Sequence, residues 1–358
     1  MTELEGILRR RVDEGGPLTF RDFMELALYH PEHGYYSSGA VRTGRAGHFM
    51  TSAELDPSFG ELWARAIEQT WELCGRPDRV SVVEIGGGEG GFAAAVLTAA
   101  QVPLTYFLVE RVGEIERRQR ERLYSFDNVS WIQSLNELVP GSAHFVIAVE
   151  VLDNSPVHVI ERAAGSLREI YVGSGLRETP GALSDPNLER FGGHLREGER
   201  CEVALDAIHM AEQLARLVER GLVCFIDYGY EGPARNTLVA YSSAGADNDV
   251  LTAPGERDLT AHVAWDPVAD ALREEGLEVH GPRLQAEVLR SLGVAELDRS
   301  LRARHDAALS EGRGAEALRA LSRRQALRAL LDEGGLGGLQ VLVGGRGIER
   351  PDWMKSSR

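Results

Sequence analysis

The sequence predicts an α/β protein built on a doubly wound, mostly parallel β-sheet. Short apolar runs alternate with helix-like segments from Val80 onward, at the spacing of β–α–β units. A glycine-rich stretch, residues 86–91, stands between an apolar run and an alanine-rich one, which is the pattern of a strand, a tight turn and a helix. The runs expected to form buried strands are "VSVVEI", "LTYFLVE", "VSWI", "HFVIAVE" and "GLVCFIDYG".

The N-terminal segment, up to about Pro77, is expected to be helical with one long loop. The stretch "PLTFRDFMELALYHPEHGYY" contains Thr19 as a candidate N-cap and Asp22 three residues later, which is typical of a helix start. The loop that follows is rich in glycine and small polar residues. Apolar residues then recur at i, i+3 and i+4 from Phe59 to Cys74, and this stripe predicts a packed amphipathic helix.

The interval between the fourth and fifth apolar runs, residues 154–220, is too long for a simple crossover. We expect it to hold a hairpin over residues 157–172 and then a helix. That helix should carry Ile208, Ala211, Ala215 and Val218. The rest of the chain predicts a helix and a strand over 262–282, a largely helical piece over 285–333, a last strand at "LQVLVGG" and a frayed tail.

Composition limits the classes of partner. The 358 residues carry a formal net charge of −16, which argues against nucleic acid or an anionic membrane as the main partner. The three cysteines show no C-x-x-C spacing and are expected to be reduced core residues. Neither a secretory signal nor a transit peptide nor a membrane span is recognisable, so we expect a cytoplasmic protein without membrane insertion. The sequence leaves open whether the chain forms a homodimer.

The glycine turn satisfies the dinucleotide pattern G-x-G-x-x-G through Gly86, Gly88 and Gly91. The next strand ends in Glu110, and a carboxylate at that position can accept hydrogen bonds from both hydroxyls of a ribose. NAD and S-adenosylmethionine both contain such a ribose. The pattern alone therefore does not decide whether the turn binds a nucleotide-like cofactor or is only a structural turn.

Two acids in the turn favour S-adenosylmethionine over NAD. Glu89 would place a negative charge beside the pyrophosphate of NAD at the helix N-terminus. S-adenosylmethionine has no phosphate, and Glu84 can attract its ammonium group directly or through water. The spacing E-x-G-x-G-x-G, met by Glu84, Gly86, Gly88 and Gly90, resembles the first motif of class I S-adenosylmethionine-dependent methyltransferases. An acid-rich structural turn is the alternative.

Several separate stretches resemble one family, the MidA-type methyltransferases, in the family's own order. The resemblance covers nearly the whole chain, from about Pro17 to Val343. Its F-x-T-S-x-E and E-x-x-D-x-x-P-V-H blocks are more specific than the glycine turn. The stretches are "PLTFRDFMELALYHPEHGYYS", "GHFMTSAELDPSFGELWA", "VVEIGGGEG", "FLVE", "VEVLDNSPVH", "CEVALDA", "FIDYGY" and "VLTAPGERDLTAHVAWDP".

The resemblance implies a class I methyltransferase (Rossmann-like) fold with an added helical lobe, and S-adenosyl-L-methionine as the cofactor. In the best understood member it implies methylation of an arginine on the quinone-side NADH dehydrogenase subunit of respiratory complex I. Glu150 and Asp153, the two acids of the E-x-x-D block, would face the methyl acceptor. The residues implied to bind the cofactor are Thr51, Ser52, Glu54, Glu84, Gly86, Gly88 and Glu110.

Together these observations predict five parts along the chain. They are a helical N-terminal lobe with a cofactor-covering loop (1–77), a cofactor-binding Rossmann-like core (78–153), an insertion (154–220), the remainder of the core with C-terminal helices (221–345) and a tail (346–358).

The chain departs from the family pattern at three places. The usual turn G-P-G-R-G has Gly87 and Glu89 in place of its proline and arginine. The block E-x-x-D-A-L-P has Asn154 and Ser155 after its aspartate. A stretch that carries a histidine in the family, residues 243–251 here, contains none. These departures leave the cofactor assignment in place and concern the acceptor.

A pair of carboxylates suits an arginine acceptor, because it can bind a guanidinium by a bidentate fork and turn one nitrogen toward the methyl group. Glu150 and Asp153 have this chemistry at the end of the fourth strand. The alternative is that Asp153 caps a turn and Glu150 bonds only backbone. No metal site is expected, because Pro31 separates His30 from His33 and no third ligand is nearby.

The leading hypothesis is a methyltransferase that acts on a protein arginine. One alternative is an enzyme that methylates an oxygen, nitrogen or carbon of a small molecule with the same cofactor site. The other is a non-catalytic assembly factor that retains the fold. Binding of S-adenosylmethionine would separate the assembly factor from both enzymes.

Overall fold

The computed structural model describes residues 2–37, 51–242 and 245–355, and the chain divides into two compact units. Unit 1 consists of Met1–Val41, Val151–Ala211 and Gly229–Ala271. Unit 2 consists of Arg42–Glu150, Glu212–Tyr228 and Leu272–Arg358. Each unit is assembled from three separate stretches of the chain.

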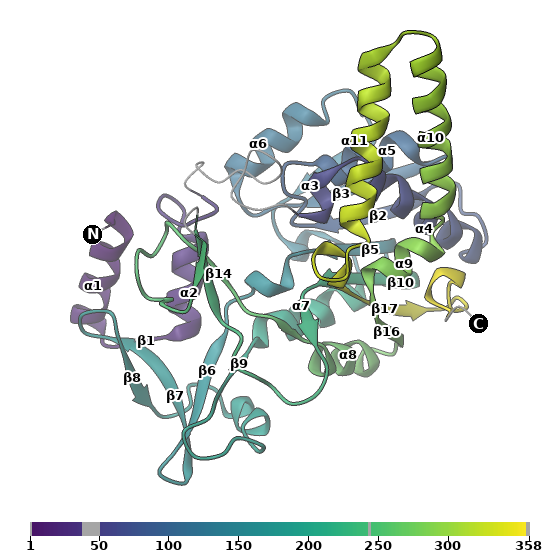
Figure 1. Cartoon of the computed structure of the whole chain (residues 1–358). Coiled ribbons are helices and arrows are strands. Elements are labelled where there is room, and N and C mark those ends of the chain that lie inside the picture. The colour runs from purple at the N-terminus through teal and green to yellow at the C-terminus, as the bar shows by residue number, and fades with distance from the viewer. Residues whose placement is uncertain (1, 38–50, 243–244, 356–358) are drawn as a thin grey trace. The chain divides into compact units, whose positions relative to one another are not determined.

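Unit 2 is built around a seven-stranded sheet with the order β16-β17-β10-β5-β2-β3-β4 (Figure 1). Five neighbouring strands, from β10 to β4, are parallel, whereas β17 runs antiparallel to both β10 and β16. The strand order reverses between β2 and β5, so the predicted doubly wound, mostly parallel sheet is confirmed. The strands are β2 (Val80–Ile85), β3 (Leu104–Val109), β4 (Val129–Ile132), β5 (Ala143–Val149), β10 (Val218–Asp227), β16 (Glu278–Leu284) and β17 (Gln340–Arg346).

The register of the parallel strands brings their carboxyl ends to one edge of this sheet. Ile85, the last residue of β2, pairs with Val109 of β3 on one side and with Ala148 of β5 on the other. The residues that follow these strands, Gly86 and Glu110 among them, therefore lie at the same edge. Ligands of doubly wound sheets bind there, at the point where the strand order reverses.

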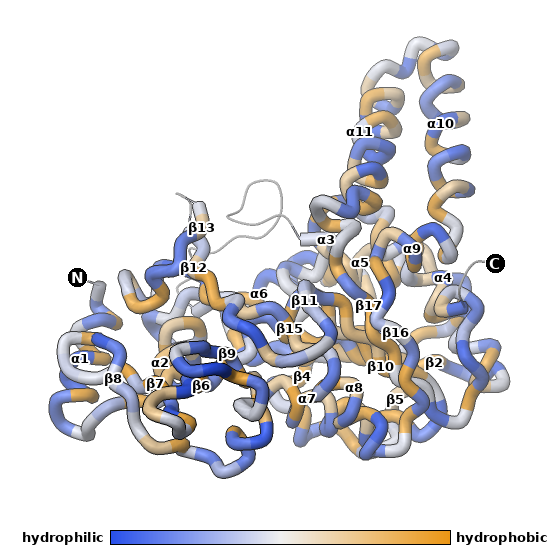
Figure 2. Tube along the Cα trace, turned by 60° about the horizontal axis from the view of Figure 1, so that its bottom comes forward, coloured by the Kyte–Doolittle hydropathy of each residue, from blue (hydrophilic) through white to orange (hydrophobic). Residues whose placement is uncertain are grey.

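Helices pack on this sheet through apolar side chains. In α4 (Ser58–Leu73), Phe59, Trp63 and Ile67 are fully buried, which confirms the predicted amphipathic helix. Strands β10 and β17 have the colour of hydrophobic residues in Figure 2, whereas α10 and α11 alternate between the two colours along their length. The other helices of unit 2 are α3 (Ser52–Leu55), α5 (Gly91–Ala99), α6 (Gly113–Arg122), α9 (Gln285–Ser291), α10 (Val294–Ser310) and α11 (Gly314–Leu330).

The last two long helices, α10 and α11, lie side by side as a hairpin (Figure 1). Arg323 of α11 joins this hairpin to α4, because its guanidinium donates to Ser58 Oγ at 2.9 Å and to Glu61 Oε2 at 2.6 Å. The predicted helical character of residues 285–333 is thus confirmed as three helices.

The prediction of a frayed tail is wrong for the described part of the C-terminus. Trp353 is only 3% exposed and packs edge-on against Trp63 with ring centroids 5.4 Å apart. Arg283 donates to the carbonyl oxygens of Trp353 and Lys355, at 3.1 and 2.9 Å. The indole burial and these two hydrogen bonds hold the short helix Asp352–Met354 against the core.

Unit 1 contains a small antiparallel sheet with the path β1-β7-β6-β9, and β8 pairs with β7 off this path. The predicted hairpin over 157–172 is present as β6 and β7. Thr19 caps α2 as expected, because its hydroxyl accepts from the Asp22 N–H at 3.0 Å. These elements are α1 (Glu3–Gly15), β1 (Leu18–Thr19), α2 (Phe20–Tyr29), β6 (His158–Ala163), β7 (Ser166–Gly173), β8 (Arg177–Gly181) and β9 (Arg200–Val203).

The remaining segments of unit 1 are short. A three-stranded sheet has the order β13-β12-β14, and β11 pairs with β15. The turn that matters most for the site is the 3₁₀ helix Leu152–Asn154. The short strands are β11 (Gly229–Tyr230), β12 (Val239–Ser242), β13 (Gly245–Asp247), β14 (Asp258–Thr260) and β15 (Val263–Ala264).

Three boundaries differ from the sequence expectation. The helix of the insertion, α7 (Leu205–Arg216), ends before Val218, which is fully buried and opens β10 by pairing with Ala143. Residues 229–271, expected in the core, belong to unit 1, and α4, expected in the N-terminal lobe, belongs to unit 2. Within the described ranges, no helix combines the length and apolar character needed to cross a bilayer.

Candidate active site

The glycine turn links β2 to α5 at the carboxyl edge of the sheet in unit 2. Gly86, Gly88 and Gly90 all have positive φ angles, of 61°, 51° and 81°, which residues other than glycine rarely adopt. The turn is closed by two short backbone hydrogen bonds, from Gly88 N to Gly86 O and from Gly90 N to Gly87 O, both 2.8 Å long. This geometry confirms the strand–turn–helix arrangement predicted from the sequence.

A glutamate from another element occupies the N-terminus of α5. Glu54 Oε1 accepts a hydrogen bond from Gly91 N at 2.9 Å, and Arg122 donates to its other oxygen at 2.7 Å. A Cβ at position 91 would lie 2.6 Å from the Glu54 carboxylate, so only glycine permits this close approach. The free N–H groups and the dipole of a helix N-terminus attract phosphate, but here the protein's own carboxylate takes that place.

Glu84, at the end of β2, is nearly inaccessible. Glu84 is only 2% exposed, and its Oε2 accepts a hydrogen bond of 2.8 Å from Tyr106 OH. Burial raises the pKa of Glu84 to about 8, and the negative charges of Glu54 and Glu110 add to this effect, whereas the Tyr106 hydrogen bond opposes it. A bound cation would lower the free-energy cost of ionising the Glu84 carboxyl group.

The departure from the family at Gly87 has a local reason. A Cβ at this position would lie 2.6 Å from Leu108 Cδ2 and 3.1 Å from the Glu84 carboxylate. A side chain at position 87 would require Leu108 to move, and glycine avoids this contact.

Glu110, after β3, is 5% exposed and accepts from Val112 N at 2.8 Å. Burial raises its pKa to about 7, although the hydrogen bonds it accepts oppose this shift. Gln119 of α6 donates to Glu110 Oε2 at 3.3 Å and to the carbonyl oxygen of Gly88 at 2.9 Å. This fully buried amide fixes the acid relative to the glycine turn, and the sequence analysis missed it.

Glu89 is less important than the sequence suggested. Its carboxylate lies 3.4 Å from Arg118 Nη1, so an arginine partly neutralises it. The negative charge that stands at the start of α5 comes from Glu54 instead.

The segment that carries Thr51 and Ser52 is held to the end of β5. Ser52 N donates to Glu150 Oε1 at 2.8 Å, and Ser52 Oγ accepts from Gln285 Nε2 at 3.0 Å. Thr51 precedes α3 without a side-chain capping bond. Glu150 has a φ of 53°, a strained conformation for a residue with a side chain, and such strain is concentrated at functional sites.

Asp153 belongs to unit 1, in the 3₁₀ helix Leu152–Asn154. It is 8% exposed, and burial raises its pKa to about 7 against the effect of backbone N–H groups that bond its carboxylate. Asp258, from β14 of the same unit, is also buried, and its pKa lies well above the usual range because of burial and the nearby charge of Asp153.

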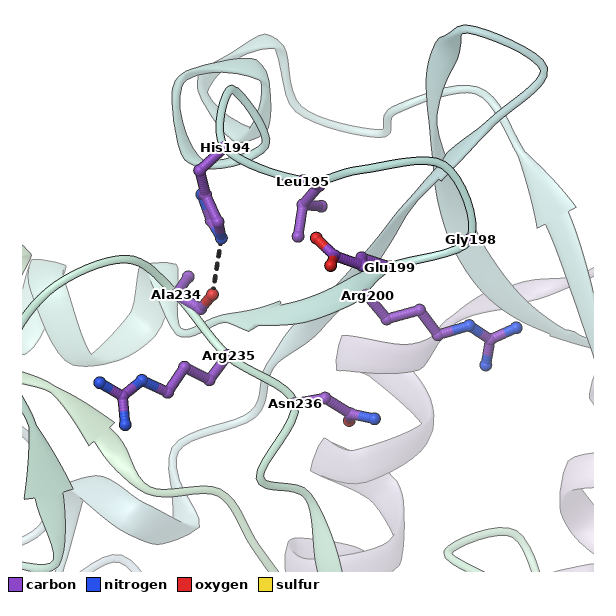
Figure 3. A pocket seen from close by; sticks show the side chains of 8 residues that line it. All are labelled: His194, Leu195, Gly198, Glu199, Arg200, Ala234, Arg235 and Asn236. Atoms are coloured by element: carbon purple, nitrogen blue, oxygen red, sulfur yellow. Dashed lines mark hydrogen bonds between the residues drawn. The ribbon is translucent and has the colours of Figure 1, made fainter.

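A separate hollow of about 440 Å³ lies on unit 1 and is drawn in Figure 3. His194 closes one side with a 2.8 Å hydrogen bond between Nε2 and the Ala234 carbonyl oxygen. Arg200 is engaged by Glu161 and Glu178, and Arg235 lies over the Tyr230 ring at 4.7 Å. Because both of these cations already have partners, this hollow shows no chemistry that competes with the carboxyl edge of the sheet. Its lining residues are His194, Leu195, Gly198, Glu199, Arg200, Ala234, Arg235 and Asn236.

The residues at the carboxyl edge fit S-adenosylmethionine better than a dinucleotide. Three carboxylates, Glu54, Glu84 and Glu110, lie buried around the glycine turn, and burial together with the charges of the other two raises the pKa of Glu84. S-adenosylmethionine brings two positive groups and a ribose, whereas a pyrophosphate would face Glu54 at the helix start. The fold and this site together define a class I methyltransferase.

Comparisons with known proteins agree with this class. The model of a family of S-adenosyl-L-methionine-dependent methyltransferases matches residues 62–283, which is more than half of the chain, and the chain belongs to this family. It is therefore an S-adenosylmethionine-dependent methyltransferase, as the MidA-type resemblance implied.

Two kinds of relative span most of the chain. The rat protein arginine methyltransferase NDUFAF7, which is mitochondrial, is 27% identical over 80% of this chain and 73% of its own length. The Drosophila melanogaster homologue is 27% identical over 82% of this chain and 76% of its own length. A crystal structure of a Burkholderia thailandensis protein bound to S-adenosyl-homocysteine superposes with a TM-score of 0.84, at 28% identity over 98% of this chain and 94% of that one. The names of the rat and fly relatives place those proteins in mitochondria, and cytoplasmic localisation of this chain stays a prediction.

Proposed function

We propose that this methyltransferase acts on an arginine side chain of a protein. The relatives named as protein arginine methyltransferases, which match about four fifths of the chain, support this substrate class. The acidic residues after β5 suit it chemically, because a guanidinium is a cation that carboxylates bind by paired hydrogen bonds. The resemblance described above further suggests a quinone-side subunit of NADH dehydrogenase as the substrate protein.

The observation that carries the cofactor part of this proposal is the cluster of buried acids at the glycine turn. We assign Glu84 to the ammonium group and Glu110 to the ribose hydroxyls, with Gly86 and Gly88 forming the backbone cradle. Thr51, Ser52 and Glu54 belong to the same site, because Glu54 bonds the first residue of α5 and Ser52 is tied to the end of β5. When bound, S-adenosylmethionine supplies the methyl group.

Glu150 and Asp153 are assigned to the acceptor. Glu150 directly follows β5, and Asp153 comes three residues later along the chain. The acceptor nitrogen loses a proton as it gains a carbon substituent, and Asp153, whose pKa is raised to about 7, can take that proton near neutral pH. Glu150 also has a positioning role, because the hydrogen bond that it accepts from Ser52 N holds the segment that carries Ser52.

Mass spectrometry of NADH dehydrogenase subunits tests the substrate class. We expect one arginine of the quinone-side subunit to carry methyl groups in a strain with the gene and to lose them when the gene is deleted. Complementation with the wild-type gene should restore the modification, and the Asp153→Asn variant should not. An unchanged arginine methylation pattern would overturn the protein-arginine assignment and favour a small-molecule acceptor, because the cofactor assignment rests on separate residues.

A further inference from the structure

A network of buried hydrogen bonds surrounds the turn that carries Asp153. Asn154 Nδ2 donates to Asp258 Oδ1 at 2.9 Å and to the Leu259 carbonyl oxygen at 3.1 Å. Tyr36 OH lies 2.9 Å from Asn154 Oδ1 and 3.2 Å from each oxygen of Asp258. All of these groups belong to unit 1.

The backbone of the same turn is held at two further points. The carbonyl oxygen of Asp153 accepts from Ala261 N at 2.9 Å, and the carbonyl oxygen of Asn154 accepts from Tyr29 OH at 3.2 Å. The turn is therefore joined to β14 on one side and to the region of α2 on the other. Residues that are about a hundred or more positions apart in sequence make these contacts, so they depend on the folded unit.

The network matters for Asp153 because Asn154 supplies one of the two backbone N–H groups that bond the Asp153 carboxylate. The Asn154 N–H bonds the Asp153 carboxylate and lowers its pKa, against the larger effect of burial. The anchored Asn154 side chain adds a further restraint on the turn that directs this N–H. The titratable groups that face this turn are Asp258 from β14, Tyr29 from α2, and Tyr35 and Tyr36 from the segment after α2.

We propose that Asn154 is a positioning residue for the methyl-transfer reaction: anchored by Asp258 and Tyr36, it holds Asp153 in its reactive orientation and ionisation state. This inference rests on the proposed role of Asp153 toward the acceptor. Asp258 and Tyr36 act through Asn154. The asparagine, which stands where the family pattern has alanine, thus has a function that the sequence alone did not indicate.

Steady-state kinetics test the inference, with the recombinant quinone-side NADH dehydrogenase subunit as the acceptor. We expect Asn154→Ala to raise the KM for that subunit about tenfold, because the hydrogen bonds of the Asn154 side chain to Asp258, Leu259 and Tyr36 are lost. The Kd for S-adenosylmethionine should stay within about twofold. The acidic limb of the kcat/KM profile should move upward by about half a pH unit, because Asp153 loses a stabilising N–H. Tyr36→Phe should show a smaller change in the same direction.

Two further variants separate positioning from general destabilisation. Asp258→Ala should raise the KM as Asn154→Ala does, and Asp258→Asn should restore most of the wild-type value, because an amide oxygen can accept the same two hydrogen bonds. Glu202→Gln is the control: this buried acid of unit 1 accepts hydrogen bonds from Thr237 N and Leu238 N and not from the turn. It should lower the thermal midpoint and leave the KM and the pH profile unchanged.

A measurement without acceptor keeps this test distinct from the proposed function. Thermal midpoints of wild type and Asn154→Ala should differ more at pH 9 than at pH 5, because a higher pKa of buried Asp153 makes its ionisation more costly. In an Asp153→Asn background that pH dependence should become smaller, and the remainder should come from Asp258, whose pKa the Asn154 side chain also lowers. An equal dependence in both backgrounds, or unchanged KM and pH limb in Asn154→Ala, would overturn the inference. Absence of arginine methylation by the wild type would instead overturn only the proposed substrate.

Discussion

Gly91 N donates a hydrogen bond of 2.9 Å to Glu54 Oε1, and this contact decides what the start of α5 can bind. In many nucleotide-binding folds the corresponding N–H groups hold a phosphate. Here a carboxylate from a short helix 37 residues earlier in the chain is bonded to the first of them. The glycine turn is thereby adapted to a ligand with positive charge and without phosphate.

A methyl group at position 91 should disturb this contact. We expect Gly91→Ala to destabilise the protein by about 1–3 kcal/mol and to weaken cofactor binding, because the new Cβ would displace Glu54. Gly113→Ala is a matched control: Gly113 is the first residue of α6 and has open space around a Cβ. Thermal unfolding and calorimetry should show a neutral or slightly stabilising effect for Gly113→Ala. Equal behaviour of the two variants would contradict the close approach of Glu54.

Removal of the acid after β3 should weaken the cofactor complex. We expect Glu110→Ala to raise the Kd for S-adenosylhomocysteine about 10- to 100-fold, because charged hydrogen bonds to the ribose are lost. Isothermal titration calorimetry measures this change directly. Glu121→Ala removes an exposed acid of the same region and should leave the Kd unchanged. A Kd for Glu110→Ala equal to that of wild type would remove the ribose assignment.

Asp153 should be needed for turnover and not for cofactor binding. We expect Asp153→Asn to lower kcat by about 100-fold or more, since a base and a ligand for the acceptor are lost together. The Kd for S-adenosylmethionine should change less than about twofold. Asp185→Asn changes a half-buried helix cap of unit 1 and serves as the control in the same radiometric assay. Normal turnover by Asp153→Asn would show that the acceptor residue lies elsewhere.

Stability of the ligand-free protein should fall as the pH rises. The pKa values of Glu84 and Glu110 are raised to about 8 and about 7, above the ordinary value of 4.5. Their protonated forms therefore stabilise the fold below about pH 4.5, and this contribution is lost as the pH rises through about 7 and 8. Thermal midpoints recorded from pH 5 to pH 9 should decrease, and Glu84→Gln should flatten the decrease. A rising midpoint over this range would contradict the burial of these acids.

The periodic parts of the fold were predictable because they depend on local patterns. The apolar runs at β2, β4 and β5 and the stripe of α4 identify buried strands and an amphipathic helix without knowledge of their neighbours. The spacing of α7 predicts Val218 in the same helix, but its pairing with Ala143 places it in β10. The buried tail was missed for a similar reason, since its partner Trp63 lies far away in sequence.

The site was predictable where a motif carries it and not where contacts between distant residues do. Glu84, Glu110 and the turn glycines follow from their place after strands. The capping of α5 by Glu54, the amide of Gln119 on Gly88, and the bond between Asn154 and Asp258 each join residues that no local pattern connects. The resemblance implies Glu54 as a cofactor residue but does not indicate that it caps α5. It does not indicate Gln119 or Asp258 at all.

Buried carboxylates at the glycine turn should bind S-adenosylmethionine through its positive charge. Calorimetry at pH 7 in two buffers of different ionisation enthalpy tests this binding mode, because it counts the protons exchanged on binding. Glu84 and Glu110 are largely or partly protonated in the free protein at this pH, so binding should release protons, and Glu84→Gln should reduce the release. Binding without proton release, or binding of NAD in preference to S-adenosylmethionine, would contradict the claim.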